Sequence, residues 1–530
     1  MRGTMRAAAA ALLVMAMAAL AELMARLVAR RQLGMAVVLG AMAQIAQRQS
    51  PALTGSSGLL VTGKMWKRIL LFAGLLASPC YAGQDRNAQV YVNLSATGYT
   101  IPSKFVGLSA EVGDLIFGFY QGPCTGAVGS WAGVANLLGR SGSFRLGGNS
   151  SDGLVAPALT SGIATNLATF MTCLGASWSL IYGLPLQINN PTTANTQAGL
   201  IATAMGGGAN VVFQFGNESI GNYVTKAQYE TNWNSYYTTI NGSIAGLLVA
   251  AADTEDFGDT QSVIAALTPG ISGMSYVTLH WYGGYNGNPY TVSSASQLIS
   301  TVPINYWQNA NTGNSNLPYI GYDLNNRWAQ NNSVKLRLSE SNSINSLGIT
   351  GYSNTLMSAT WYLNQAITFA NMGWDGINTH NAYGHGTGNG NGIYNPIVSK
   401  DGGNTYQAAP EFYGLYLFSM IENQQTVAVS RGGNANINAI ATVGGNGNAN
   451  ILIVNNDPSN NSVVTPGQSS AWTTATVLLL SGTSCADAAP TLGGSIIGPG
   501  GAYSGVTTSL ASGASVSIPP CGAALIEIQP

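Results

Sequence analysis

Short apolar runs alternate with polar, Gly- and Asn-rich turns and with longer segments that can form helices, from about residue 102 to 400. Strands that alternate with helices in this way are typical of parallel βα units. Eight such runs within about 300 residues match a (β/α)8 TIM barrel in number and size. The expected strands are residues 105–109, 143–146, 179–184, 210–215, 262–267, 275–279, 334–339 and 376–379.

The pattern changes after about residue 400, where short β-rich runs such as 450–454, 475–480 and 523–528 are separated by Gly, Asn, Pro and Ser. Runs of this kind predict an antiparallel β-sandwich over residues 401–530. An earlier run at 89–94, within 83–101, precedes the barrel and can pair into the same sandwich. We therefore predict an α/β fold with a catalytic barrel over 102–400 and an accessory sandwich built from both ends of the chain.

The amino-terminal region predicts export. Residues 65–82 contain a basic start, a short apolar core and a small residue at the expected cleavage site after Ala82, which together indicate a secretory signal peptide. Residues 1–64 lie upstream and are expected to be absent from the mature protein; the alternative is a membrane-associated amphipathic leader. We expect a secreted or periplasmic protein with no membrane span after cleavage.

Charge excludes one class of partner. Charged residues are only 7% of the chain. From residue 83 onward there are 10 basic and 19 acidic residues, so the formal net charge is 10 − 19 = −9. Nucleic-acid binding requires a basic surface. Nucleic acid is therefore not an expected partner.

Four cysteines remain after the expected cleavage. An even number in an exported chain indicates two disulfides. We expect local pairing, Cys124 with Cys173 and Cys485 with Cys521, although three connectivities are possible.

Two glutamates stand out because carboxylates are scarce. Only eight Glu occur from residue 83 onward, and two of them, Glu218 in FQFGNES and Glu340 in KLRLSES, follow apolar runs. In a barrel, reactive groups lie at the carboxyl ends of the strands. Two carboxylates placed there are what hydrolysis of a glycosidic bond requires. The pair predicts a glycoside hydrolase.

Other polar side chains near strand ends are expected at the same face. Arg145 can hold a carboxylate nucleophile ionised, although a structural ion pair is an equal alternative. The amide of Asn217 can bind a sugar 2-hydroxyl. His280-Trp281-Tyr282 ends the sixth run. There, Tyr282 can hydrogen-bond the nucleophile, His280 supports the site, and Trp281 is either a sugar platform or part of the core.

No metal or cofactor site is expected. His380 and His385 follow the eighth run, but the whole chain has only three His, and their positions do not suggest a zinc site. The sequence also contains no Gly-x-Ser-x-Gly motif, phosphate loop or dinucleotide-binding motif. Carbohydrate is the one class of substrate that the motifs suggest.

Four segments in order, FVGLSAE (105–111), RLGGNSSD (145–152), GNE (216–218) and LSESN (338–342), resemble glycoside hydrolase family 79. That family includes bacterial β-glucuronidases and heparanase-like enzymes. The resemblance covers most of residues 85–530. It implies a retaining double displacement with a barrel and a sandwich built from both chain ends.

The resemblance also implies individual roles. Glu218 would be the acid/base and Glu340 the nucleophile, while Asp152 would contact sugar hydroxyls. Gly392 and Tyr394 resemble the loop that receives the glucuronate carboxylate.

One position departs from the family pattern, because Asn345 stands near where a carboxylate-binding Tyr is expected. The predicted function is an exported retaining β-glucuronidase. The alternatives are another barrel glycosidase, such as a β-xylosidase or arabinofuranosidase, and a non-catalytic carbohydrate-binding surface protein.

Overall fold

The computed structural model describes most of the chain beyond the expected leader: residues 85–139, 141–152, 158–254, 263–268, 270, 273–284, 294, 298–299, 335–383, 392–445 and 447–529. The segments predicted as an upstream extension (1–64) and a signal peptide (65–82) lie outside the described residues. Among the described residues, no helix combines the length and the apolar character needed to cross a membrane.

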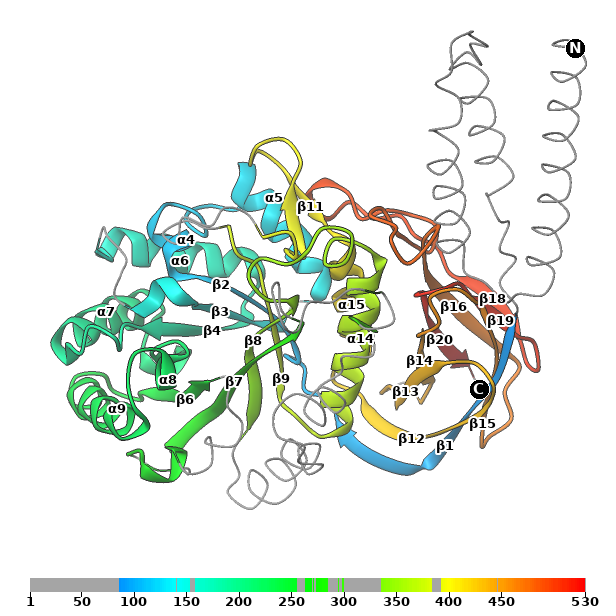
Figure 1. Ribbon diagram of the computed structural model, residues 1–530, viewed down its shortest axis with the longest axis horizontal. Helices are drawn as coiled ribbons and strands as arrows, with labels where there is room; N and C mark the ends of the chain where they lie inside the picture. The colour runs from blue at the N-terminus through cyan, green and yellow to red at the C-terminus, as the bar shows by residue number, and fades with distance from the viewer. Residues whose placement is uncertain are drawn as a thin grey trace, which may run out of the picture. The chain divides into compact units, whose positions relative to one another are not determined.

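Eight parallel strands close into a barrel, as predicted (Figure 1). Each strand pairs in parallel with its neighbours, and β2 pairs with β9 to complete the ring. Most strand residues are buried on both faces, which is usual for parallel sheets that helices cover. The strands are β2 (Val106–Glu111), β3 (Ser141–Gly147), β4 (Ser177–Leu184), β5 (Val211–Phe215), β6 (Leu248–Thr254), β7 (Met274–Gly284), β8 (Leu336–Ile344) and β9 (Gly376–His380).

The predicted fifth strand, residues 262–267, is wrong. The fifth barrel strand is β6, and residues 263–266 are helical. The run at 262–267 has modest apolar content, and β-branched residues are few in both segments, so propensity favours neither as a strand. Length and burial distinguish the true strand: β6 has seven residues, and six of them are buried.

Local signals in the sequence explain where several helices begin. Asn190 caps α7, and Pro191 occupies its first turn; Thr225 and Gln228 form a capping box at α9. The helices are α4 (Val112–Ile116), α5 (Gly126–Ala135), α6 (Ser161–Leu174), α7 (Pro191–Ala204), α8 (Ser219–Asn222), α9 (Lys226–Asn241), α14 (Leu356–Asn371) and α15 (Pro410–Ser419), with 3-10 turns η2 (Asn136–Leu138), η3 (Asn149–Asp152), η4 (Gly208–Asn210) and η7 (Pro499–Gly501).

A second, ten-stranded sheet forms the β domain. Apolar residues from both ends of this sheet, such as Val464, Ile518, Val477 and Leu510, belong to one core cluster, so the sheet closes on itself as a sandwich. Its strands are β1 (Arg86–Thr100), β12 (Gln425–Gly433), β13 (Ile437–Val443), β14 (Ala449–Asn455), β15 (Ser462–Gln468), β16 (Thr474–Ser481), β17 (Thr491–Leu492), β18 (Thr508–Ala511), β19 (Val516–Ile518) and β20 (Ala523–Gln529).

The amino-terminal strand β1 lies inside the sandwich, as predicted. It pairs antiparallel with β12 on one side and parallel with β15 on the other. Between barrel and sandwich, the chain forms a small sheet of β10 (Ile397–Ser399) and β11 (Tyr406–Ala408), followed by α15. Because α15 packs against α14 and β2, we propose that the barrel domain includes α15 and that the β domain resumes at β12.

Both predicted disulfides are present, Cys124–Cys173 and Cys485–Cys521. The second bond lies beside the contact between the two domains: the Thr360 hydroxyl in α14 donates to the Cys521 carbonyl, and the Leu356 amide donates to the Asp487 carbonyl at 2.8 Å. The bond therefore anchors the segment of the β domain on which α14 rests.

Candidate active site

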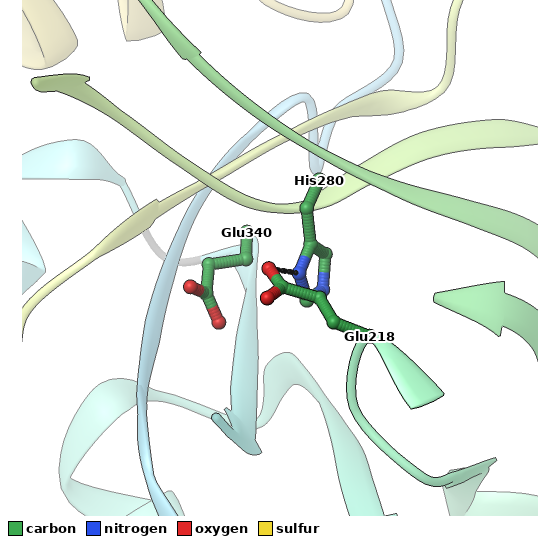
Figure 2. A group of neighbouring side chains, drawn as sticks. All are labelled: Glu218, His280 and Glu340. Atoms are coloured by element: carbon green, nitrogen blue, oxygen red, sulfur yellow. Dashed lines mark hydrogen bonds and ion pairs between the residues drawn. The ribbon is translucent and has the colours of Figure 1, made fainter. Parts of the chain in front are cut away.

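The two glutamates singled out in the sequence meet at the carboxyl ends of the barrel strands (Figure 2). Glu218 follows β5, and Glu340 lies within β8. One carboxylate oxygen of each, together with a ring nitrogen of His280, lies within 4.8 Å of the other two. The two carboxyl groups therefore face a common space.

The backbone at Glu218 is fixed in an unusual conformation. Glu218 has a left-handed φ of 49°, which is uncommon outside glycine. Its amide donates to the Asp253 carbonyl at 2.9 Å, and its own carbonyl accepts from Asn222 at 2.8 Å. The turn thus directs the Glu218 carboxylate toward the barrel axis, where its side chain keeps 18% exposure.

Glu340 is held from two sides. Arg145 donates from Nη1 to Oε2 at 2.7 Å, and the Tyr282 hydroxyl donates to Oε1 at 2.5 Å. Burial by itself raises the pKa of this carboxyl. The charges of His380, His280 and Arg145 outweigh burial and hold the Glu340 pKa well below its usual range. Glu340 is therefore an ionised carboxylate at neutral pH.

The Arg145 guanidinium is fully buried and uses all of its nitrogens. Besides Glu340 it donates to Asp253 and Asn217 from Nη2, both at 2.8 Å. Its Nε donates to Gln214 at 2.8 Å, and Nη1 also reaches the Ser109 hydroxyl at 3.1 Å. Burial disfavours its charge, but Asp253 and Glu340 raise the Arg145 pKa above its ordinary value. The expected inward arginine is present.

His280 joins Glu218 to Asp253. Its Nδ1 lies 2.6 Å from Glu218 Oε1, and its Nε2 lies 2.6 Å from Asp253 Oδ1. Burial lowers the His280 pKa, but Asp253, followed by Glu340, raises it to about 10. Asp253 is fully buried, which raises its pKa; Arg145 and His280 reverse this and lower it. Asp253 and Glu340 therefore favour a second proton on the His280 ring, at Nδ1 beside Glu218.

Asn217 and Asp152 lie against this group. The Asn217 amide oxygen accepts from Arg145, and its Nδ2 donates to Asn149 at 3.1 Å. Since a side-chain amide has two N–H donors, one remains for a ligand. Asp152 accepts from the Asn217 backbone amide through Oδ2 at 3.2 Å. Burial raises the Asp152 pKa to about 7, against the lowering effect of backbone hydrogen bonds from Asn217 and Leu186.

Tyr394 lies beside Tyr282, whose hydroxyl contacts the nucleophile, and Gly392 in the same loop already has a backbone partner. Tyr394 packs beside Tyr282 with ring centroids 6.3 Å apart. The Gly392 amide donates to the Ala382 carbonyl at 2.9 Å, and the Ile393 amide donates to Leu347 at 2.7 Å. The Gly392 amide thus already has a backbone acceptor, and the Tyr394 side chain is the nearer candidate contact for a substrate carboxylate.

The Glu218, His280 and Glu340 group has a composition that can ligate a metal. A metal-binding His needs a nitrogen lone pair directed at the ion. Both nitrogens of His280 face carboxylate oxygens at 2.6 Å. The ring therefore joins Glu218 to Asp253 and suits proton transfer, whereas a metal ion would have to displace one of these two contacts.

Three residues of this group were not assigned a role from the sequence. Asp253 is the penultimate residue of β6, the strand that was misplaced; the signal was the apolar run LLVAAA (247–252), which an acid follows directly. Glu111 ends β2, accepts from the Ser150 amide at 2.9 Å and lies 3.6 Å from His380 Nε2. His380 Nδ1 lies 3.8 Å from Glu340. Both appear in the sequence as polar residues at strand ends.

Trp281 belongs to the core. It is 4% exposed and stacks on Trp361 of α14 at 5.7 Å between ring centroids. The stacking on Trp361 supports the packing alternative that the sequence left open, and the sugar platform stays a prediction. His385 lies outside the described residues.

No family model matches the chain, and no curated protein matches it. Solved structures do resemble it. A family 51 arabinofuranosidase from Xanthomonas axonopodis pv. citri has a TM-score of 0.56 at 14% identity, covering 84% of this chain and 100% of that one. A 4-O-α-L-rhamnosyl-β-D-glucuronidase from Fusarium oxysporum has a TM-score of 0.58 at 14% identity, with 82% and 99% covered.

CelM2, a bifunctional glucanase-xylanase from a metagenome library, has a TM-score of 0.58 at 14% identity, with 84% of this chain and 99% of that chain covered. At such low identity the likeness shows the fold, a barrel with a β-sandwich domain. These neighbours are all glycoside hydrolases. They do not distinguish family 79 from related families, so that resemblance remains a prediction.

Proposed function

We propose that the protein is an exported retaining glycoside hydrolase. The observation that carries the proposal is the approach of the Glu218 and Glu340 carboxylates to within 4.8 Å. Retaining enzymes keep their two carboxyl groups about 5–5.5 Å apart, whereas inverting enzymes separate them by about 6.5–9.5 Å to admit a water. The neighbours in fold are glycosidases, which supports the same reading.

The environments of the two carboxylates suggest their roles. Glu340, ionised and oriented by Arg145 and Tyr282, attacks the anomeric carbon while the glycosidic C–O bond breaks. Glu218 donates a proton to the leaving oxygen. A water then attacks the glycosyl ester, gives its proton to Glu218 and releases Glu340. Asn217 and Asp152 contact sugar hydroxyls in this proposal, since Asn217 has a second amide N–H and Asp152 lies beside it.

We propose a β-glucuronide as the first candidate substrate. The motifs that resemble family 79 support it, and one neighbour in fold is named as a glucuronidase. Tyr394 would hold the carboxylate of the sugar through its hydroxyl, while Tyr282 donates to Glu340. The two disulfides support the prediction of export, because such bonds persist in oxidising compartments.

A second candidate is an arabinofuranoside, for a specific reason. The Gly392 amide donates to Ala382 instead of facing a ligand, and Asn345 replaces the expected Tyr. Both reduce the support for a sugar carboxylate. A neighbour in fold is named as an arabinofuranosidase.

A panel of p-nitrophenyl glycosides tests the proposal: β-glucuronide, α-L-arabinofuranoside, β-xyloside and β-glucoside. We expect hydrolysis of one of the first two, with retention of anomeric configuration observed by proton NMR. Glu340→Gln should lower kcat by about 10⁴-fold or more while leaving the fold intact. Near-wild-type activity in Glu340→Gln, or an inverted product, would contradict the mechanism.

A further inference from the structure

Four charge-assisted hydrogen bonds link the two candidate catalytic carboxylates in one chain. Glu340 accepts from Arg145, which donates to Asp253 Oδ2 at 2.8 Å. Asp253 Oδ1 contacts His280 Nε2, and His280 Nδ1 contacts Glu218, both at 2.6 Å. Asp253 is the central member, and each of its oxygens serves a different half of the chain.

Asp253 is built into the barrel from several strands. Its Oδ1 also accepts from the Ser339 hydroxyl at 2.6 Å and from the Gln214 amide at 2.5 Å. Its backbone carbonyl accepts from the Glu218 amide at 2.9 Å. The residue thus fixes the side chain of His280 and the backbone of Glu218 at once.

We propose that Asp253 is a positioning residue that retains the acid/base proton on the Glu218–His280 pair and ties that pair to the nucleophile through Arg145. This inference rests on the proposed glycosidase function and assigns a residue for which neither the sequence motifs nor the fold gave a role.

The charge of Asp253 affects the proton that Glu218 and His280 share. At 2.6 Å, one proton between Glu218 Oε1 and His280 Nδ1 can reside on either atom, so the pair as a unit gains and loses it. The negative charge of Asp253 stabilises the protonated pair. A neutral residue at position 253 removes this stabilisation, and the pair then loses its last proton at lower pH.

Charged groups on three strands influence the pair. Asp253 on β6 and Glu340 on β8 both raise the His280 pKa. Arg145 on β3 lowers the Asp253 pKa, and the charge of Asp253 helps raise the pKa of the nearby Asp152. Of these, only Asp253 contacts both His280 and Arg145.

The test compares Asp253→Asn with Asp375→Asn, a carboxylate that also contacts a buried arginine, at the other end of the barrel. The substrates are 2,4-dinitrophenyl and methyl glycosides of the sugar identified by the panel. We expect Asp253→Asn to move the alkaline limb of kcat/KM at least about one pH unit lower. The loss should be at least about tenfold larger on the methyl glycoside, whose leaving group needs the proton.

Asp375→Asn should change neither the alkaline limb of kcat/KM nor the relative activity on the two glycosides. An unchanged alkaline limb together with equal losses on both substrates would overturn the proposal. If Asp253→Asn does not fold, His280→Gln removes the other partner of the Asp253–His280 contact. It should likewise lower the alkaline limb and cost more activity on the methyl glycoside, and an unchanged limb with equal losses would again overturn the proposal.

A readout without substrate separates this inference from the proposed function. In ¹⁵N NMR of the wild type at pH 8, His280 should carry protons on both nitrogens, with its resonances assigned by their loss in His280→Gln. Asp253→Asn should lose one of the two protons. A neutral His280 beside an unprotonated Glu218 in the wild type at pH 8 would overturn the proposal even if glycosides are hydrolysed.

Discussion

Two arginines, Arg145 and Arg337, are fully buried at opposite ends of the same barrel, and their partners differ. Arg145, near the carboxyl end of β3, contacts the carboxylates of Glu340 and Asp253 at 2.7–2.8 Å. Arg337, at the start of β8, contacts Asn378 at 2.5 Å, the Phe105 carbonyl at 3.4 Å and Asp375 at 3.4 Å.

The difference shows how one barrel separates chemistry from stability. At the amino end, two backbone carbonyls, the Asn378 amide and the Asp375 carboxylate accept from Arg337. At the carboxyl end, Arg145 holds together acids that repel one another, and these acids face the space between Glu218 and Glu340. Residues at the carboxyl end of a barrel serve catalysis, and those at the amino end serve stability.

Arg145→Met should have the largest effect. It leaves Glu340 and Asp253 buried without their cation, so the nucleophile loses both its charge and its orientation. We expect kcat/KM on the accepted glycoside to fall about 10³-fold or more. Circular dichroism should show that the fold is retained. A loss below tenfold would remove the distinction between the two arginines.

Arg337→Met should act on stability instead. Removal of one partner of a buried ion pair costs about 3–5 kcal/mol, and we expect a decrease of this size in the free energy of unfolding, measured with guanidinium chloride. The kcat/KM of the folded fraction should stay within about twofold. A large catalytic loss in folded Arg337→Met would show that the amino end also serves the chemistry.

Tyr282→Phe should have an intermediate effect. A hydrogen bond to a charged group contributes about 1.5–3 kcal/mol, so kcat should fall about 10- to 100-fold. The control is Tyr182→Phe, which removes a buried hydroxyl that has no partner among the described residues. It should leave kcat unchanged. Equal losses in both variants would mean that the Tyr282 contact contributes only through packing.

The smallest effect is a dependence of stability on pH. The His280 pKa is raised from 6.5 to about 10, because Asp253 and then Glu340 outweigh burial. The resulting stabilisation is complete below about pH 6.5 and is lost as pH rises through about 10, with a slope of at most about 1.4 kcal/mol per pH unit. His280→Gln should flatten this slope in denaturation curves from pH 7 to 10, whereas Asp375→Asn should keep it. An identical slope in His280→Gln would assign the effect to another group.

The sequence predicted the barrel because seven of its strands are distinct apolar runs bounded by turns, and it predicted Glu218 and Glu340 because scarce acids stand out. It failed at β6, where an Ala-rich segment carries little β propensity, and Asp253 was missed with it. Motifs located Gly392 near the nucleophile, but no motif can show that its amide already has a backbone acceptor. Such contacts depend on tertiary packing between loops far apart in the chain.

The place of β1 in the sandwich has a consequence for biogenesis. The Leu94 amide bonds the Ser469 side chain, 375 residues later, and β12 and β15 flank β1 on both sides. This strand, the first among the described residues, therefore has no sheet to join until nearly the whole chain has been made. Until then it stays unpaired, and the exposed Asn87, Gln89 and Asn93 make one of its faces largely polar. An affinity tag fused directly to residue 85 would adjoin β1, and one fused to residue 530 would adjoin β20, which is also paired on both sides, so a tag at either end needs a flexible linker.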